Sequence, residues 1–514
     1  MTLRGGRLSS LERPLVPLVG ALFALGLGAT IALVDSWLLS LLIVVGVTGV
    51  ILLARSNARI WLGVLACVVA FDGLLKLTFW PSIWPQLLTP VALCCVYLRT
   101  LFVRPNLSWL PFVVVPLLGL GLLTILSLLS MIANGQQSSL AGLVGIYTWV
   151  AFAPLAWVGA TLLSERKEIE RAAFYVLLIA APISAVAAIQ YLLGAAWYAS
   201  LGPGFAQATI GVAGFSGEGV FRVNGTFSSP GHLAGFMIPV TFLSIVATMA
   251  GERRSTRWAG GVGLVATTVT LFANNQRSWA VIVLVGIPIL YLLTRSSVRP
   301  ARWLSLGVIA FGGLLVGAAV AGPGLVDRVL TVAVDPVQVI LGSTLGDFGV
   351  LKLASIIDAG TLLGNGPGTA TIGARYFGAI WELTENYFAN AYYELGPFGL
   401  VALASAVFTV PTITLRAWKA EPDQFVRTFL AATLVYQAAI IVISISYSPL
   451  AYPPSALFFW IGGGIAASRL ADASQSTRTP EAAEQTIRVA HLSWSARNGR
   501  LVGSGTRPST ATGR

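Results

Sequence analysis

The sequence carries little charge for its length. Of its 514 residues, 10% are Asp, Glu, Lys or Arg and 56% are hydrophobic, whereas soluble domains carry about 25% charged residues. This composition excludes a water-soluble fold. Apolar stretches long enough to cross a bilayer separate the charges, and helices satisfy their backbone hydrogen bonds internally in lipid. The predicted fold class is therefore all-α, a polytopic transmembrane helical bundle of about 12–14 spans.

Histidine and cysteine are also scarce. His232 and His491 are the only histidines, which excludes a metal centre built from several imidazoles. The three cysteines, Cys67, Cys94 and Cys95, lie in apolar segments without metal-ligand spacing and are interpreted as small core residues. We therefore expect no metal and no cofactor.

Two groups of apolar stretches predict the spans. The first group lies near 14–34, 36–54, 60–75, 86–98, 109–131, 141–163 and 172–193, and the second near 231–250, 258–273, 279–294, 303–321, 395–415, 428–446 and 453–468. The spans at 60–75 and 86–98 are the least distinct, because Lys76 and several Trp and Pro residues interrupt that region.

Basic residues recur in every second loop between these spans. Short loops rich in Lys and Arg stay in the cytoplasm, so the N-terminus and the C-terminal tail are both predicted to be cytoplasmic. The net charge of +12 is then a signal of topology, and no nucleic-acid partner is expected. Six of the 32 Lys and Arg residues are left on the external side: Lys76, Arg222, Arg277, Arg328, Lys352 and Arg375.

The predicted organisation alternates membrane segments with two long external loops. Loops of such length are usually functional or disordered, and the second is expected to contain interfacial helices over the outer mouth of the bundle. The segments are a cytoplasmic N-terminus (1–13), N-terminal spans (14–193), an external loop (194–230), central spans (231–321), a long external catalytic loop (322–394), C-terminal spans (395–468) and a disordered basic cytoplasmic tail (469–514).

Three motifs on the predicted external side together resemble a known family. They are Arg222-Val-Asn-Gly225-Thr226-Phe227-Ser-Ser-Pro230-Gly-His-Leu-Ala234, then Gln276-Arg277-Ser278-Trp279, then Gly364-Asn-Gly-Pro-Gly368 through Glu385-Asn386 to Glu394-Leu-Gly396-Pro-Phe-Gly399-Leu. In this order they resemble the O-antigen ligase and polymerase superfamily of bacterial polysaccharide assembly. The resemblance covers about 220–400. There are two departures: Glu385 stands where the family's ligases usually carry His, and Gly231 stands where the family carries Asn.

The resemblance implies a glycosyltransferase of the bacterial cytoplasmic membrane, similar to the O-antigen polymerases and ligases. Such proteins transfer or polymerise glycan from a polyprenyl-diphosphate-linked oligosaccharide onto an acceptor hydroxyl at the external face, without a nucleotide sugar. The implied partners are this donor, a glycan, lipid or protein acceptor, and membrane lipid, with a chain-length regulator as a possible further partner. Glu385 in place of His and the high span count favour a polymerase slightly over a ligase.

The chemistry assigns roles to particular side chains. Guanidinium groups suit a diphosphate leaving group through bidentate hydrogen bonds, so Arg222 and Arg277 are the candidate clamp. Glu385 is the candidate base that accepts the proton of the attacking hydroxyl, in an inverting displacement that needs no metal. The candidate substrate-binding residues are Asn224, His232, Lys352, Arg375, Asn386 and Tyr387.

Simpler interpretations stand beside these. Arginine at a membrane interface is often only an anchor, and Glu385 has the position of a helix cap. Lys352 and Arg375 also fit solvated charges in a loop. His232 also fits a hydrogen-bonded polar residue at the start of a helix, and Tyr387 also fits the belt of aromatic residues at a membrane interface. The alternative function is a multi-span solute transporter. A transport path would place ionisable residues near mid-membrane, and none stands clearly at the centre of a predicted span.

Overall fold

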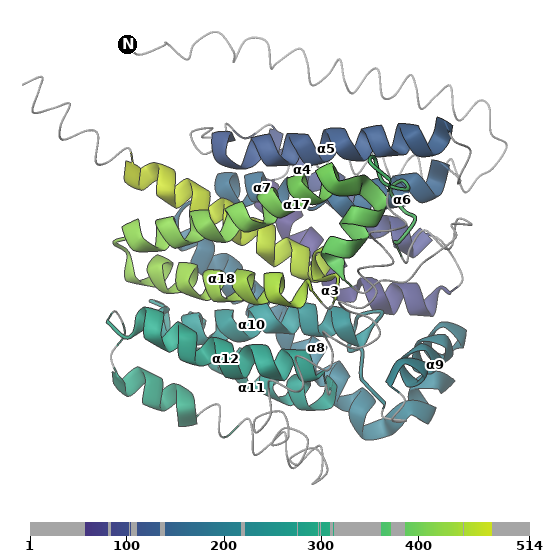
Figure 1. The fold of residues 1–514 in the computed structure, drawn as a ribbon. Helices are drawn as coiled ribbons and strands as arrows, with labels where there is room; N and C mark the ends of the chain where they lie inside the picture. The colour runs from purple at the N-terminus through teal and green to yellow at the C-terminus, as the bar shows by residue number, and fades with distance from the viewer. Residues whose placement is uncertain are drawn as a thin grey trace, which may run out of the picture.

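The computed structural model describes a helical bundle (Figure 1). The described residues are 57–80, 84–101, 103, 110–133, 139–216, 221–274, 276–296, 298, 300–308, 312, 361–371, 386–445 and 447–474. Over these residues the chain forms helices and no strands. The spans predicted at 14–34 and 36–54, most of 303–321, and the tail beyond 474 lie outside them.

The described elements are α3 (Ala58–Thr78), η1 (Trp84–Leu87), α4 (Leu88–Leu101), α5 (Leu110–Ala133), α6 (Ser139–Val150), α7 (Leu155–Leu162), α8 (Arg166–Ser200), α9 (Pro203–Ser216), α10 (Pro230–Ala250), α11 (Arg254–Asn274), α12 (Arg277–Thr294), α17 (Tyr387–Ala420), α18 (Gln424–Ile443) and η4 (Pro449–Ala451). A last helix covers 453–474.

Six described helical segments are long and apolar enough to cross a membrane: Ala58–Thr78, Ala141–Leu162, Arg166–Ser200, Pro230–Ala250, Tyr387–Ala420 and Gln424–Ile443. This confirms the all-α polytopic prediction and makes the chain a membrane protein.

Helix α10 lies at the centre of the bundle, packed against α8, α11, α12 and α18. Its most apolar window is 89% buried, against 33% for the corresponding window of α8. A helix that is apolar all round must be enclosed by its neighbours or by lipid. On α8 the exposed residues include Leu178, Ile189 and Leu192, which fits a helix with one face towards lipid.

The backbone breaks at glycine or near proline in three places in or next to the predicted spans. In α8 the backbone breaks at Gly194 (φ +80°), and in α17 it breaks at Gly396 (φ +70°) just before Pro397. The predicted span 141–163 is divided into α6 and α7 by a turn before Pro154. Proline lacks an N–H and breaks the helical ladder. The backbone breaks at Gly194 and Gly396 lie within one residue of the predicted span ends at 193 and 395, and a further helical segment lies beyond each break.

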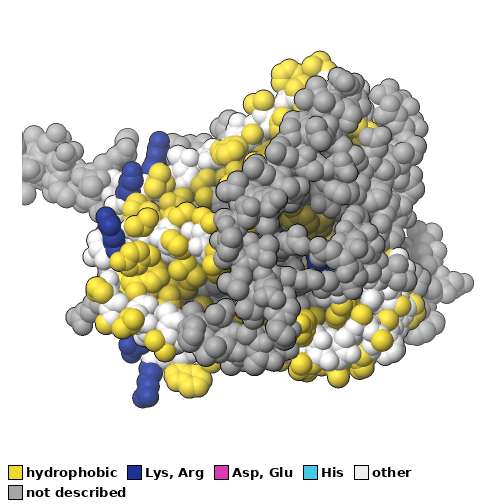
Figure 2. All heavy atoms as spheres, turned by 60° about the horizontal axis from the view of Figure 1, so that its bottom comes forward, with side chains coloured by type: hydrophobic (Ala, Val, Ile, Leu, Met, Phe, Trp, Pro, Cys, Tyr) yellow, Lys and Arg dark blue, Asp and Glu magenta, His cyan; other side chains and the backbone are white. Residues whose placement is uncertain are grey.

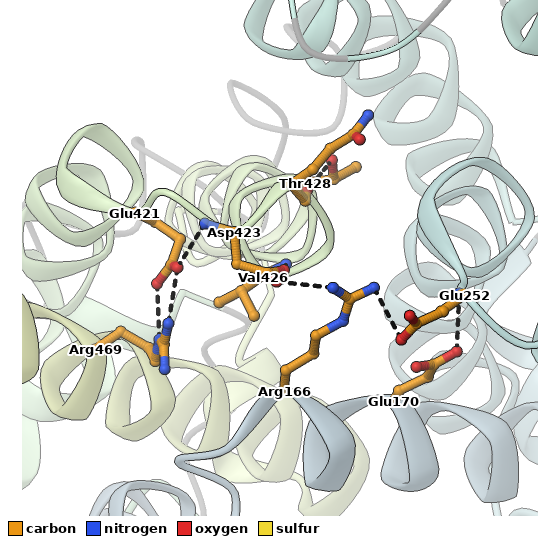
Figure 3. A network of polar contacts seen from close by, with 9 residues as sticks. Arg166, Glu170, Glu252, Glu421, Asp423, Val426, Thr428 and Arg469 are labelled. Carbon is orange, nitrogen blue, oxygen red and sulfur yellow. Dashed lines mark hydrogen bonds and ion pairs between the residues drawn. The ribbon is translucent and has the colours of Figure 1, made fainter.

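Three loops predicted to be cytoplasmic meet at one end of the bundle. Arg166 donates from Nη1 to Asp423 (2.8 Å) and lies 3.4 Å from Glu252, while Glu170 accepts the backbone N–H of Glu252 (3.0 Å). Figure 3 shows these side chains converging from α8, the α10–α11 turn and the α17–α18 turn. In Figure 2 most of the visible Lys and Arg side chains gather at this same end, beside an apolar surface. We call it the basic end.

A second ion pair lies at the basic end. Arg469, from the helix over 453–474, binds Glu421 through two bonds, Nε to Oε2 (2.7 Å) and Nη2 to Oε1 (2.8 Å). The Glu421 side chain is only 2% exposed. A bidentate geometry of this kind is among the stronger charge-assisted contacts. The pairing places the start of the C-terminal tail beside the α17–α18 turn.

Candidate functional site

The segment 221–229, which carries the first motif, lies at the end of the bundle opposite the basic end, where α3 ends and α10 begins. The buried Gln190 side chain holds it: Oε1 accepts the N–H groups of Asn224 (3.2 Å) and Gly225 (2.8 Å), and Nε2 donates to the Gly225 carbonyl (2.7 Å). Asn224 in turn donates from Nδ2 to the Tyr198 hydroxyl (3.2 Å). Gly225 has a positive φ of 59°, which a side chain would strain. Asn224, a predicted substrate contact, is therefore fixed inside the fold.

Thr226 is inserted against helix α3. The Leu74 N–H donates to the Thr226 carbonyl (2.8 Å), and the Thr226 hydroxyl donates to the Ala70 carbonyl. Thr226 thus binds both the Ala70 carbonyl and the Leu74 N–H, two backbone groups one helical turn apart in α3. Gly73 permits this approach, since a Cβ there would lie 2.0 Å from the Phe227 carbonyl carbon. The glycine in α3 and the threonine of the motif form one packing unit.

Thr226→Val removes the hydroxyl at nearly constant volume. It is expected to destabilise the protein by about 1–3 kcal/mol, because the buried Ala70 carbonyl loses its donor. Thermal unfolding of the purified protein in detergent would measure the loss. Thr241→Val is the matched control, since that buried hydroxyl donates only to Met237 in its own helix. If Thr226→Val and Thr241→Val unfold at the same temperature, Thr226 does not stabilise the packing against α3.

The residue two positions before the second motif contacts the first motif. Asn274, at the end of α11, donates from Nδ2 to the carbonyls of Val223 (2.9 Å) and Pro230 (3.1 Å). The chain then turns into α12, whose first residue is Arg277. The Arg277 side chain lies outside the described residues. Its backbone lies three residues after Asn274, which binds the first motif at Val223 and at Pro230. The Arg222 side chain is half-buried in the same segment.

His232 stands at the first turn of α10, beside a polar turn after α18. Its Nδ1 is 3.0 Å from the Ser228 hydroxyl, and its ring centre is 4.3 Å from that of Tyr452. Tyr447 stacks on Tyr452 at 5.4 Å. A Cβ at Gly231 would lie 2.4 Å from the Tyr447 hydroxyl. A side chain at position 231 would therefore require the Tyr447 ring to move.

The third motif is tied to the same turn. Asn386 caps α17, with Oδ1 accepting the N–H groups of Phe388 and Ala389 (both 3.0 Å). The Tyr387 N–H donates to the Ser444 carbonyl (2.9 Å), and Asn390 donates to the Ser448 hydroxyl (3.2 Å). Asn386 therefore makes the cap that was considered for Glu385. Ser444, Ser448 and Tyr452 link the third motif to His232, and the sequence analysis assigned none of them to the candidate site.

Glu394 is the most enclosed carboxylate near this region, with 0% exposure. Its Oε2 accepts from Trp149 Nε1 (2.5 Å) and the Gly368 N–H (3.0 Å). Its Oε1 accepts from the Ala370 N–H (2.7 Å) and the Thr371 hydroxyl (2.9 Å). The glycine turn of the third motif is thus a cradle for this carboxylate. We call Glu394 with these four donors the carboxylate cradle.

The cradle supports the start of α17. Trp149 donates to Glu394 and packs on Tyr387, with ring centres 5.1 Å apart. Tyr387, a predicted substrate contact, is 2% exposed, so its ring is held within the bundle. Glu385 immediately precedes Asn386 and lies outside the described residues, as do Lys352 and Arg375.

An ion pair in α3 was not expected. Asp72 and Lys76 are 2.5 Å apart, with side chains 10% and 19% exposed. The sequence does carry a sign of this pair, because Asp72 stands four residues before Lys76 in an apolar segment, and this spacing places both side chains on one face of a helix. Asp72 lies about 9 Å from the end of α3 at the helical rise. The pair is therefore inside a span, though not at its centre.

Nothing in the described ranges groups three or more His, Cys, Asp or Glu side chains as a metal ion would require. Comparison of the chain with protein-family models and with curated proteins gives no match.

Proposed function

We propose that this protein is a membrane glycosyltransferase similar to the O-antigen polymerases and ligases, using a polyprenyl-diphosphate-linked oligosaccharide as donor. One observation carries the proposal. At the end of the bundle opposite the basic end, Asn274, just before the second motif, binds the first motif at Val223. The turn after α18 contacts His232 of the first motif through Tyr452, and it contacts Tyr387, at the start of α17, through Ser444.

The proposed reaction is a displacement at the anomeric carbon of the donor sugar. The acceptor hydroxyl forms the new C–O bond, the bond to the diphosphate breaks, and the diphosphate leaves with the electron pair. Arg222 and Arg277 stabilise the charge that develops on the leaving oxygens, a contribution that is commonly the largest in such sites. Glu385 accepts the hydroxyl proton. Attack opposite the diphosphate inverts the anomeric centre.

The orientation follows from the basic end. Three loops rich in Arg and Lys meet there, and such loops remain cytoplasmic. We accordingly assign the motif end to the external side of a bacterial cytoplasmic membrane and both chain termini to the cytoplasm. The acceptor is then a glycan, lipid or protein at the external face, and a chain-length regulator is a possible accessory. A carboxylate at 385 favours polymerisation over ligation.

A solute transporter is the second candidate. The buried Asp72–Lys76 pair and the helices broken at Gly194 and Gly396 are features of transport sites. Against it, the pair lies near one end of α3, whereas transporters bind substrate near the bilayer midplane.

Deletion of the gene in its native strain tests the proposal. A polymerase predicts loss of glycan chains longer than one repeat unit, with that unit still attached to its acceptor. A ligase predicts full-length polymer stranded on the lipid carrier. An unchanged glycan profile, together with uptake of a labelled solute by the reconstituted protein, would reject the enzyme in favour of the transporter.

A further inference from the structure

A groove of about 390 Å³ enters the bundle near the basic end. Its walls come from α3, α8, α10, α18 and the helix over 453–474, and most of its lining is apolar, for example Ala66, Ile179, Phe242 and Ile461. The volume falls in the range of roughly 300–1,000 Å³ typical of ligand pockets. It offers room for one long apolar chain.

The charged residues of the lining stand together at one mouth. Arg59 lies 2.5 Å from Glu168, and Arg171 lies 3.9 Å from the other oxygen of the same carboxylate. Two guanidinium groups share one carboxylate, so the mouth keeps a net positive charge. The Arg59 and Arg171 side chains are 49% and 54% exposed, whereas Glu168 is 9% exposed. The cations therefore face outwards from the mouth.

The length of the groove matches one leaflet. From Glu168 to Ile179, α8 advances about 17 Å at its helical rise, close to half of the roughly 30 Å hydrocarbon core. The charged mouth then stands at headgroup level, and the apolar part reaches towards the midplane. A groove at this depth has hydrocarbon rather than water as its surroundings.

We propose that the groove is a binding site for an anionic phospholipid of the leaflet at the basic end. One acyl chain lies between α3, α8 and α10, and the phosphate binds the guanidinium groups of Arg59 and Arg171, whose planar donors suit phosphate oxygens. Basic residues at a membrane surface select anionic over zwitterionic lipid. The site is separate from the three motifs, so it stands whether or not the proposed glycosyl transfer is correct.

Native mass spectrometry of the full-length protein tests the site, with palmitoyl-oleoyl phosphatidylglycerol and phosphatidylcholine as probes. The wild type is expected to retain phosphatidylglycerol about fivefold more strongly than phosphatidylcholine, and Arg171→Gln to lose that preference. Arg295→Gln is the control, because this exposed arginine ends α12 away from the groove lining. Equal retention of both lipids by the wild type would overturn the proposal.

Gly63 permits a test of the apolar part. It lines the groove, and a Cβ there would meet no atom within 4 Å, so Gly63→Trp fills the groove without a backbone clash. This variant is expected to lose the bound phosphatidylglycerol. Gly121→Trp is the matched control, since a Cβ at Gly121 also meets nothing within 4 Å but lies on α5, outside the lining.

A photo-crosslinking residue at position 63 identifies the occupant. A covalent adduct with phosphatidylglycerol supports the proposal. Crosslinking to residues 36–54 of the same chain, without a lipid adduct, would show that the protein fills its own groove and would overturn the lipid site.

Discussion

Arg222→Gln is expected to reduce glycan transfer roughly 10²–10³-fold, the usual cost of removing one donor that stabilises developing charge. Arg222 stands in a segment fixed by Gln190, Asn274 and Thr226, so its backbone should remain in place after the substitution. The measurement is the polymer formed by a deletion strain expressing the variant, compared on gels with the wild type. Membrane abundance, measured by immunoblot, separates lost catalysis from lost protein.

Two further variants sharpen this test. Arg222→Lys keeps the positive charge but loses the planar pair of donors, and it is expected to restore activity only in part. Arg295→Gln removes an exposed arginine at the other end of the bundle and should leave the polymer unchanged. Normal polymer from Arg222→Gln at normal abundance would remove Arg222 from the proposed clamp.

The helices were largely predictable because hydrocarbon imposes a length and an apolar composition on each span. The basic end was predictable for a similar reason, since charge in short loops decides which side they occupy. Helix ends near glycine and proline were less predictable. Gly396-Pro397 has the composition of a helix boundary, and the backbone of α17 (Tyr387–Ala420) does break at Gly396, but the helical segment from Tyr387 to Leu395 before that break was not predicted.

The contacts of the candidate site were not predictable from the sequence. Gln190, Asn274 and Tyr452 each bind or pack against the first motif from distant parts of the chain, and no local spacing marks them. The glycine turn 364–368 was interpreted as part of a motif. Gly368 of this turn, with Ala370 and Thr371 just after it, donates to the Glu394 carboxylate, and this tertiary contact forms only on folding.

Glu394→Ala is expected to be the most destabilising carboxylate substitution in the described part of the chain. It would leave four donors without an acceptor, among them Trp149 Nε1 and the Gly368 N–H. At about 1–3 kcal/mol for each buried group left unpaired, and with some relaxation, the expected loss is roughly 3–5 kcal/mol. Thermal unfolding in detergent, followed by tryptophan fluorescence, would measure it.

Matched variants distinguish the cradle from a general effect of lost charge. Glu394→Gln keeps the volume and one oxygen acceptor but turns an amide towards donors, so an intermediate loss is expected. Glu252→Gln removes a carboxylate whose side chain is 70% exposed and whose partner Arg166 lies 3.4 Å away, so a change within about 0.5 kcal/mol is expected. If Glu394→Ala unfolds at the same temperature as the wild type, the carboxylate cradle does not stabilise the protein. If it melts early, Tyr387 and the start of α17 lose their support through Trp149. The proposed glycan transfer should then fall with stability, although Glu394 is fully buried.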